Sequence, residues 1–184
     1  MKKIILLVIM VVMSVTMLGA SFEKAVDFTF SYEGSKLDTT SSHSRYGVSK
    51  DTIKRYNKKY GTGYTVKSLT KSQAEKIARK LYWNTYKLDN LESDVVGVAV
   101  FDFMYNSNPY NAAKQIEKAA KSLGAKIKVD GTLTIAEMTS MNKLDSDKLR
   151  DKICDYRLAY MQGLKVWKKY KKGWTKRVTA IKSL

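Results

Sequence analysis

Three types of amino acid are nearly absent from the chain, which has one cysteine, one proline and one histidine in 184 residues. With Cys154 alone, no disulfide can form within the chain. Cys154 and His43 are too few for a zinc site, which needs three or four protein ligands. A catalytic thiol would need a partnering base, so we interpret Cys154 as a small buried apolar residue. The single proline and the ten glycines argue against a disordered or fibrous chain.

Acidic residues are also scarce. The 17 Asp and Glu are opposed by 34 Lys and Arg, which gives a formal net charge of +17. This charge implies an anionic partner, and nucleic acid, a membrane surface and an acidic wall polymer would all satisfy it. The hydrophobic fraction of 44% is enough for a core, and the length suits one domain or two small lobes that share a core.

The N-terminus has the pattern of a secretory signal. A basic start, Met1-Lys2-Lys3, precedes an apolar run over residues 4–20 that ends in small residues. We expect residues 1–20 to be a signal peptide cleaved after Ala20. Because Leu18 stands where a small residue is preferred, an uncleaved anchor, associated with the inner membrane through residues 4–20, stays open. Export to the periplasm or the cell exterior makes nucleic acid a poor partner, so we expect none.

The rest of the chain has the 3.6-residue period of helices. The predicted helices span residues 22–32, 49–60, 70–82, 95–106, 109–124, 132–141, 146–171 and 173 onward. The segment 95–106 has a β-branched start that would also suit a buried strand, but no second strand is in sight to pair with it. We predict an all-α fold in two lobes, residues 21–90 and 91–184.

The chain is organised around its polar stretch at residues 33–49. Gly34 ends the first helix, so Glu33 lies at a helix C-terminus, where the negative end of the macrodipole favours the protonated carboxyl that a general acid needs. Asp38 follows after four loop residues. Two carboxyl groups that flank a glycosidic bond are the usual machinery of glycoside hydrolysis. Two acids in a polar loop are also typical of a solvated surface.

Several motifs resemble one family. Phe30-Ser31-Tyr32-Glu33-Gly34, followed after a polar loop by Arg45-Tyr46-Gly47-Val48-Ser49, resembles the start of glycoside hydrolase family 108, the lysozyme-like muramidases. The likeness continues in order through Leu69-Thr70, Tyr82-Trp83, Val100-Phe101-Asp102, Asn106-Ser107, Asp130-Gly131-Thr132-Leu133 and Lys172-Gly173-Trp174-x-x-Arg177-Val178. The resemblance implies a lysozyme-like fold with a small catalytic lobe at 21–90, a helical peptidoglycan-binding lobe at 91–184, and Glu33 as the general acid.

The chain departs from the family pattern in the loop. Ser35-Lys36 replaces the family's Gly-Tyr, and the loop is shorter than usual. The family's second acid lies farther from the glutamate, at an offset where this chain has Ser42. Asp38 is the only acid in the loop and is our candidate for the base. Ser44 stands where the family has threonine, and its hydroxyl is our candidate for holding the attacking water.

Four further residues are predicted to bind substrate: Tyr46, Trp83, Asp102 and Asn106. The amide of Asn106 suits an N-acetyl group, and Asp102 would contact the glycan or orient Glu33. Structural roles compete with these predictions, since Asp102 also suits a buried carboxylate bonded to an arginine, and Trp83 also suits a core anchor. We interpret His43 as a loop residue or a sugar contact.

These observations predict an exported N-acetylmuramidase. It would cleave the β-1,4 bond between N-acetylmuramic acid and N-acetylglucosamine, with Glu33 as general acid and Asp38 as base, and would need no metal or cofactor. Its partner would be the peptidoglycan glycan strand, and we expect a monomer. Two alternatives stay open: a lytic transglycosylase that uses Glu33 alone, and a non-catalytic cationic protein that binds the wall or assists secretion.

Overall fold

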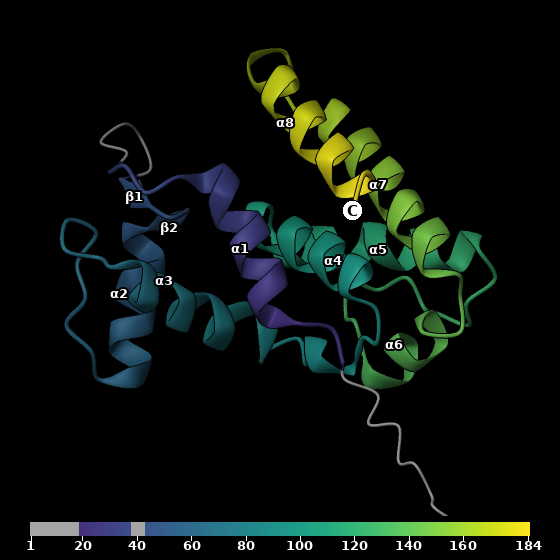
Figure 1. Cartoon of the computed structure of the whole chain (residues 1–184), viewed down its shortest axis with the longest axis horizontal. Helices are drawn as coiled ribbons and strands as arrows, with labels where there is room; N and C mark the ends of the chain where they lie inside the picture. Colours follow the sequence, from purple (N-terminus) through teal and green to yellow (C-terminus); the bar gives the residue numbers. More distant parts are fainter. Residues whose placement is uncertain (1–18, 38–42) are drawn as a thin grey trace, which may run out of the picture.

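The computed structural model of the chain describes residues 19–37 and 43–184 (Figure 1). This part is mainly helical, as predicted. Its α-helices and strands are α1 (Phe22–Glu33), β1 (Ser44–Arg45), β2 (Val48–Ser49), α2 (Lys50–Tyr60), α3 (Lys71–Ala78), α4 (Asp94–Asn106), α5 (Pro109–Ser122), α6 (Ile135–Met141), α7 (Ser146–Gln162) and α8 (Trp167–Lys182). A π-helical turn, η1 (Arg79–Trp83), continues α3, and a short 3-10 helix, η2 (Leu88–Asn90), precedes α4. The predicted division into lobes at residues 21–90 and 91–184 stays a prediction.

Helix α4 forms the centre of the molecule. Residues 96–105 are all buried, as expected for a helix that is apolar on every side. Helix α1 packs along it, while α5 and α7 cover other sides (Figure 1). Aromatic rings connect these layers, because Phe22 of α1 meets both Phe101 of α4 and Trp83 edge-on, at centroid distances of 5.8 and 5.5 Å. The helical interpretation of this segment is therefore confirmed and the strand interpretation is wrong.

Side-chain caps fix where the helices begin. The Ser49 hydroxyl accepts a hydrogen bond from the Thr52 amide at the start of α2. The predicted capping box at α3 is present, with the Thr70 hydroxyl bonded to the Gln73 amide and the Gln73 side chain bonded back to Thr70. These caps satisfy amides that the first helical turn leaves without partners.

The loop that the sequence predicts as irregular contains a small β-hairpin. Strands β1 and β2 pair antiparallel with Ser44 opposite Ser49 and Arg45 opposite Val48. The two turn residues, Tyr46 and Gly47, have φ angles of 54° and 72°. Positive φ at both central residues is the requirement of a type I′ hairpin turn. The hairpin escaped prediction because strands of two residues leave no alternating pattern.

Two predicted helix boundaries in the C-terminal half are wrong. Helix α7 ends at Gln162 rather than near residue 171, and α8 begins at Trp167 rather than at Gly173. A glycine is tolerated inside a helix at a cost of about 1 kcal/mol, so Gly173 does not stop α8. The chain instead turns back at residues 163–166, because α8 then packs antiparallel along α7 and buries Val178 and Ile181.

Cys154 lies in this packed interior, 1% exposed. This burial confirms its interpretation as an apolar core residue, and it raises the pKa of the thiol to about 12. Ala20 is also buried, and its amide donates to the Leu91 carbonyl at 2.6 Å. The rest of the predicted signal or anchor, residues 1–18, lies outside the described residues. Across residues 19–37 and 43–184, no helix has the length and apolarity needed to cross a membrane.

Candidate active site

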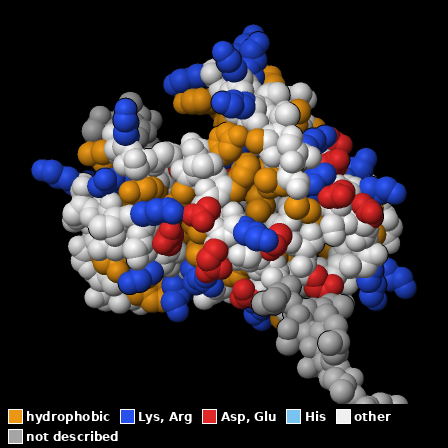
Figure 2. All heavy atoms as spheres, viewed as in Figure 1, with side chains coloured by type: hydrophobic (Ala, Val, Ile, Leu, Met, Phe, Trp, Pro, Cys, Tyr) orange, Lys and Arg blue, Asp and Glu red, His pale blue; other side chains and the backbone are white. Residues whose placement is uncertain are grey.

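Glu33 is the last residue of α1, as the sequence predicts. Gly34 caps the helix with a φ of 72° and donates its amide to the Phe30 carbonyl at 3.1 Å. The Glu33 side chain is 17% exposed. The β-hairpin lies on one side of it and α8 on the other. Figure 2 shows the surface hollowed between the hairpin side and the projecting end of α7 and α8. Glu33 is therefore half-sheltered but reachable from solvent.

Two donors from distant parts of the chain hold the Glu33 carboxylate. Arg177 Nη1 of α8 lies 2.6 Å from Glu33 Oε1, and Asn106 Nδ2 at the end of α4 lies 2.7 Å from the same oxygen. The Arg177 guanidinium also lies over the Tyr32 ring, at 5.4 Å from its centroid. Within the described residues, both hydrogen bonds of the Glu33 carboxyl end on Oε1. Oε2 accepts no hydrogen bond from these residues.

Arg177 is itself fixed by a buried charge network centred on Asp102. The Asp102 carboxylate accepts from Arg177 Nε and Nη2 and from Arg157 Nη1, at 2.6 to 3.1 Å. The Thr29 hydroxyl donates to it at 2.8 Å. Asp102 is 0% exposed and Arg157 1%. Glu33 is thus oriented by an arginine that has little freedom to move.

Charge balance explains why so many ionised groups can be buried here. Burial opposes the charge of Asp102, but Arg157 and Arg177 together outweigh it and hold the pKa of that carboxyl below its ordinary value. Burial likewise opposes the charge of Arg177, but Asp102 and then Glu33 raise its pKa above the ordinary value. Buried ions are tolerated only when they are paired and hydrogen-bonded in this way.

The hairpin turn forms the other side of the site. The Tyr105 hydroxyl of α4 donates to the Tyr46 carbonyl at 2.8 Å, and burial raises the pKa of Tyr105 well above its ordinary value. A Cβ at Gly47 would lie 2.8 Å from Tyr105 Cε1 and 2.9 Å from Glu33 Cδ. Only a glycine lets the turn approach the glutamate this closely.

Replacing Gly47 by alanine is expected to lower activity about 100-fold, because displacing a catalytic group by about 1 Å costs this much. The new methyl group must push Glu33 or Tyr105 aside. Steady-state release of fragments from purified cell walls measures the effect. Gly61→Ala is the matched control, since Gly61 has a similar φ of 64° and a methyl group there would meet no atom within 4 Å. Equal activity of the two variants would contradict a tight fit at Gly47.

Known proteins resemble this chain in both sequence and fold. The family model described as Glycosyl hydrolase 108 matches residues 26–107. A solved structure, "Structure of Brucella abortus SagA", is 30% identical to this chain, covers 88% of it and 91% of the SagA chain, and superposes with a TM-score of 0.74. The chain belongs to glycosyl hydrolase family 108. No curated protein sequence matches it.

Membership in family 108 confirms the resemblance and the lysozyme-like fold that the sequence predicts. It makes the chain a glycoside hydrolase by family. The segment matched by the family model, residues 26–107, contains Glu33, the hairpin and Asn106. Arg177, which holds the carboxylate, lies outside that segment and comes from α8.

Only some of the residues predicted to form the active site of this family 108 chain are found at Glu33. Glu33 lies at the site. Ser44 lies in β1, half-buried and paired with Ser49. Asp38 falls outside the described residues, so its role as the base stays a prediction. Asn106, which bonds Glu33, and Tyr46, in the hairpin turn, are half-buried, and their contacts to substrate stay predictions. His43 is exposed just before β1.

Two predicted substrate contacts are corrected by the structure. Trp83 is 0% exposed, packs against Phe22 and donates its Nε1 to Asp89 Oδ1 at 2.6 Å. Asp102 is also 0% exposed. Neither side chain has surface left for a sugar, so direct binding of the glycan by these two residues is wrong. Asp102 instead acts through Arg177, the alternative that the sequence left open.

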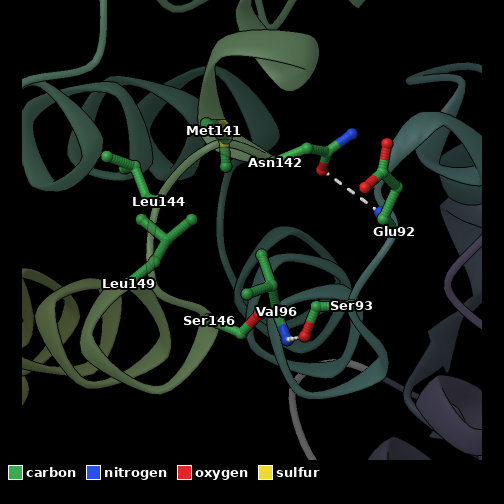
Figure 3. A pocket seen from close by; sticks show the side chains of 8 residues that line it. All are labelled: Glu92, Ser93, Val96, Met141, Asn142, Leu144, Ser146 and Leu149. Atoms are coloured by element: carbon green, nitrogen blue, oxygen red, sulfur yellow. Dashed lines mark hydrogen bonds between the residues drawn. The ribbon is translucent and has the colours of Figure 1, made fainter.

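Two pockets of this family 108 chain are not lined by Glu33. One of about 660 Å³ lies against α2 beside His43 and Leu37, with Asn57 and Tyr64 among its walls. The other, of about 310 Å³, lies between the first turn of α4, the end of α6 and the start of α7 (Figure 3). Figure 3 shows Asn142 beside Glu92, and Asn142 Oδ1 accepts a hydrogen bond from the Glu92 backbone amide at 3.2 Å. This second pocket lies at the end of α4 opposite Asn106, away from the candidate active site at Glu33.

Sequence reasoning missed the two arginines, Arg177 and Arg157, that help to fix Glu33. Arg177 belongs to one of the family-like motifs, but nothing local indicates that it reaches Glu33, 144 positions earlier. Arg157 gives one signal: it lies at helical spacing among Ile153, Cys154 and Met161, on a face that is mostly apolar. A basic residue on an apolar face usually has a buried acid as partner, and Asp102 is the acid on a buried helix.

Proposed function

We propose that this protein is an N-acetylmuramidase that hydrolyses the β-1,4 bond between N-acetylmuramic acid and N-acetylglucosamine in peptidoglycan. The observation that carries the proposal is the environment of Glu33. In a chain of a glycosyl hydrolase family, an acid at a helix end is held on one oxygen by Arg177 and Asn106. The side chain keeps 17% of its surface exposed, between the hairpin and α8. A glycan strand laid in the recess between these two elements would present its glycosidic oxygen to Glu33.

The contacts of Glu33 suit the carboxylate that general acid catalysis leaves behind. Once Glu33 has given its proton to the leaving oxygen, the carboxylate that remains is stabilised by the positive charge of Arg177 and the amide of Asn106. Three of the four hydrogen bonds from Arg177 go to Asp102 and one goes to Glu33. The guanidinium is therefore already in position, so no reorganisation is needed as charge develops on Glu33.

Asp38 completes the proposed mechanism as the base. It would activate a water on the opposite face of the sugar, with the Ser44 hydroxyl helping to hold that water. Direct attack by water inverts the anomeric centre, and enzymes of this kind keep their two carboxyl groups about 6.5–9.5 Å apart. The proposed partner is the glycan strand, and the proposed location is the periplasm or the cell exterior. We propose that the enzyme acts as a monomer.

Mass spectrometry of the released muropeptides tests the reaction type. We expect products that end in a reducing N-acetylmuramic acid, because water is the nucleophile. Asp38→Asn is expected to lower their rate of release about 100-fold or more, as loss of a general base does. Asp51→Asn, an exposed acid in the first turn of α2, is the control and should leave the rate unchanged.

Anhydro products, lighter by one water, together with full activity of Asp38→Asn would contradict the hydrolase. They would identify a lytic transglycosylase in which the substrate's own hydroxyl attacks and Glu33 works alone.

A further inference from the structure

The C-terminal end of the chain carries positive charge without acid. The last acidic residue is Asp155, and residues 156–184 contain seven lysines and two arginines. Both arginines, Arg157 and Arg177, are buried against Asp102. The charge that faces solvent therefore comes from lysines alone. All seven are exposed, and six of them gather at one end: Lys165, Lys168, Lys169, Lys171, Lys172 and Lys176. Within the described residues, none of the six forms an ion pair.

Aromatic residues are interleaved with these lysines. Trp167, Tyr170 and Trp174 follow one another at helical spacing and share a face of α8. Their rings contact each other, with centroids 6.2 Å apart for Trp167 and Trp174 and 5.4 Å apart for Tyr170 and Trp174. Within the described residues, neither Trp167 nor Trp174 is among the partly buried side chains that pack against the hydrophobic core. Tyr170 is 43% exposed and the preceding Val166 is 46% exposed.

This end of the molecule also projects. We call residues 164–176, the turn after α7 and the first half of α8, the α7–α8 tip. Figure 1 shows the tip extending past the other helices. Figure 2 shows Lys and Arg side chains gathered around hydrophobic ones at the same end. A flat surface can meet such a projection without touching the rest of the protein.

We propose that the α7–α8 tip docks the protein on an anionic lipid surface. Trp and Tyr bury their rings at the headgroup boundary while their polar atoms stay hydrated. Lysines that flank such rings are attracted to anionic headgroups. A soluble polyanion would use the lysines but give the rings nothing to enter. A neutral glycan would stack on the rings but gain nothing from six cations. An anionic bilayer uses both sets.

The position of the tip is compatible with catalysis. Trp174 precedes Arg177 by three residues on α8, and Trp167 lies about 15 Å along the helix from it. Arg177 is the residue that holds Glu33. Docking by the tip would therefore hold the active site a short, fixed distance from the bilayer and leave the recess open. The inference concerns where the protein sits and does not depend on the reaction that Glu33 catalyses.

Tryptophan fluorescence of the full chain tests this proposal. The three tryptophans are Trp83, Trp167 and Trp174, and Trp83 is fully buried, so lipid-dependent quenching reports on the tip alone. The protein is titrated with phosphatidylglycerol-containing vesicles and with pure phosphatidylcholine vesicles. Both carry lipids brominated along the acyl chains, which quench only rings that enter the bilayer.

We expect quenching with the anionic vesicles, weakened by salt as surface charge attraction is. The tip variant K168Q/K169Q/K171Q/K172Q should bind them at least about 100-fold more weakly, since each lysine near an anionic surface contributes severalfold. The control variant K58Q/K118Q/K121Q/K126Q removes the same charge from exposed lysines elsewhere. It should keep both its binding and its quenching.

Three results would overturn the proposal. Equal loss in the tip and control variants would mean that net charge, not the tip, binds the vesicles. Binding without bromolipid quenching, together with equal binding to soluble polyglutamate, would show a general electrostatic surface. A change in tryptophan emission with soluble wall glycan but not with vesicles would make the aromatic face a sugar-binding surface.

Discussion

Replacing Glu33 by glutamine is expected to reduce cell-wall hydrolysis by about 10³-fold, within the range that general acid catalysis contributes. Glutamine keeps the size of the side chain and an oxygen for Arg177 and Asn106, but its amide cannot deliver a proton. The loss should therefore appear in the chemical step while the fold stays intact. Turbidity of wall suspensions and release of muropeptides both measure the loss, and circular dichroism checks the fold.

The matched control lies on the same helix. Glu23 is in the first turn of α1, 71% exposed and paired with Arg79. Glu23→Gln removes the same charge far from the site and should hydrolyse walls at the wild-type rate. If the wild type and Glu33→Gln clear walls equally, the catalytic assignment is wrong. If neither clears them, the alternative of a non-catalytic wall-binding protein gains support.

Replacing Asp102 by asparagine is expected to lower the free energy of unfolding by about 3–5 kcal/mol, the usual cost of removing one partner from a buried ion pair. Asp102 is the carboxylate that Arg157 and Arg177 share. The Nε and Nη2 atoms of Arg157 already have no partner among the described residues, so its charge would be left uncompensated. Urea denaturation near neutral pH measures the change.

Activity should fall together with stability in this variant, because Arg177 would lose the anion that orients it toward Glu33. The control is Asp155→Asn. Asp155 pairs with Lys182 at the surface and is 52% exposed, and such pairs contribute at most about 1 kcal/mol. A stability loss in Asp102→Asn no larger than in this control would show that the buried arginines are satisfied in another way.

At acidic pH, the free energies of unfolding of the wild type and of Asp102→Asn should differ less than they do near neutral pH. The two arginines hold the pKa of Asp102 below its ordinary value in the folded protein, whereas the unfolded chain has a value near 3.9. The contribution of this carboxyl is therefore fully present above about pH 4 and is lost as the pH falls below it. Urea titrations at about pH 6 and about pH 3 compare the two regimes. A difference that stays constant would contradict the role of the Asp102 charge.

The local structure followed from local signals in the sequence. Hydroxyl caps and the glycine at position 34 place the ends of α1, α2 and α3, because each is satisfied by atoms within a few residues. The same short-range rules put Glu33 at a helix C-terminus. Collinear motifs indicated the family before the fold was known. The β-hairpin was not predicted, because strands of two residues leave no alternating pattern. The boundary between α7 and α8 was predicted wrongly, because packing of α8 against α7 overrides the local preference around Gly173.

A helical fold, the acid at position 33 and a large excess of positive charge could all be derived from the order of the amino acids. The pairing of the charged residues could not be derived in this way. No periodicity shows that Arg177 reaches Glu33 across 144 positions, or that Asp102 and Arg157 brace it from the interior. Nor does composition separate Trp83, which is buried, from the Trp167–Trp174 pair, which packs outside the core. Burial and ion pairing depend on which helices pack together, and that follows from the shape of the whole core.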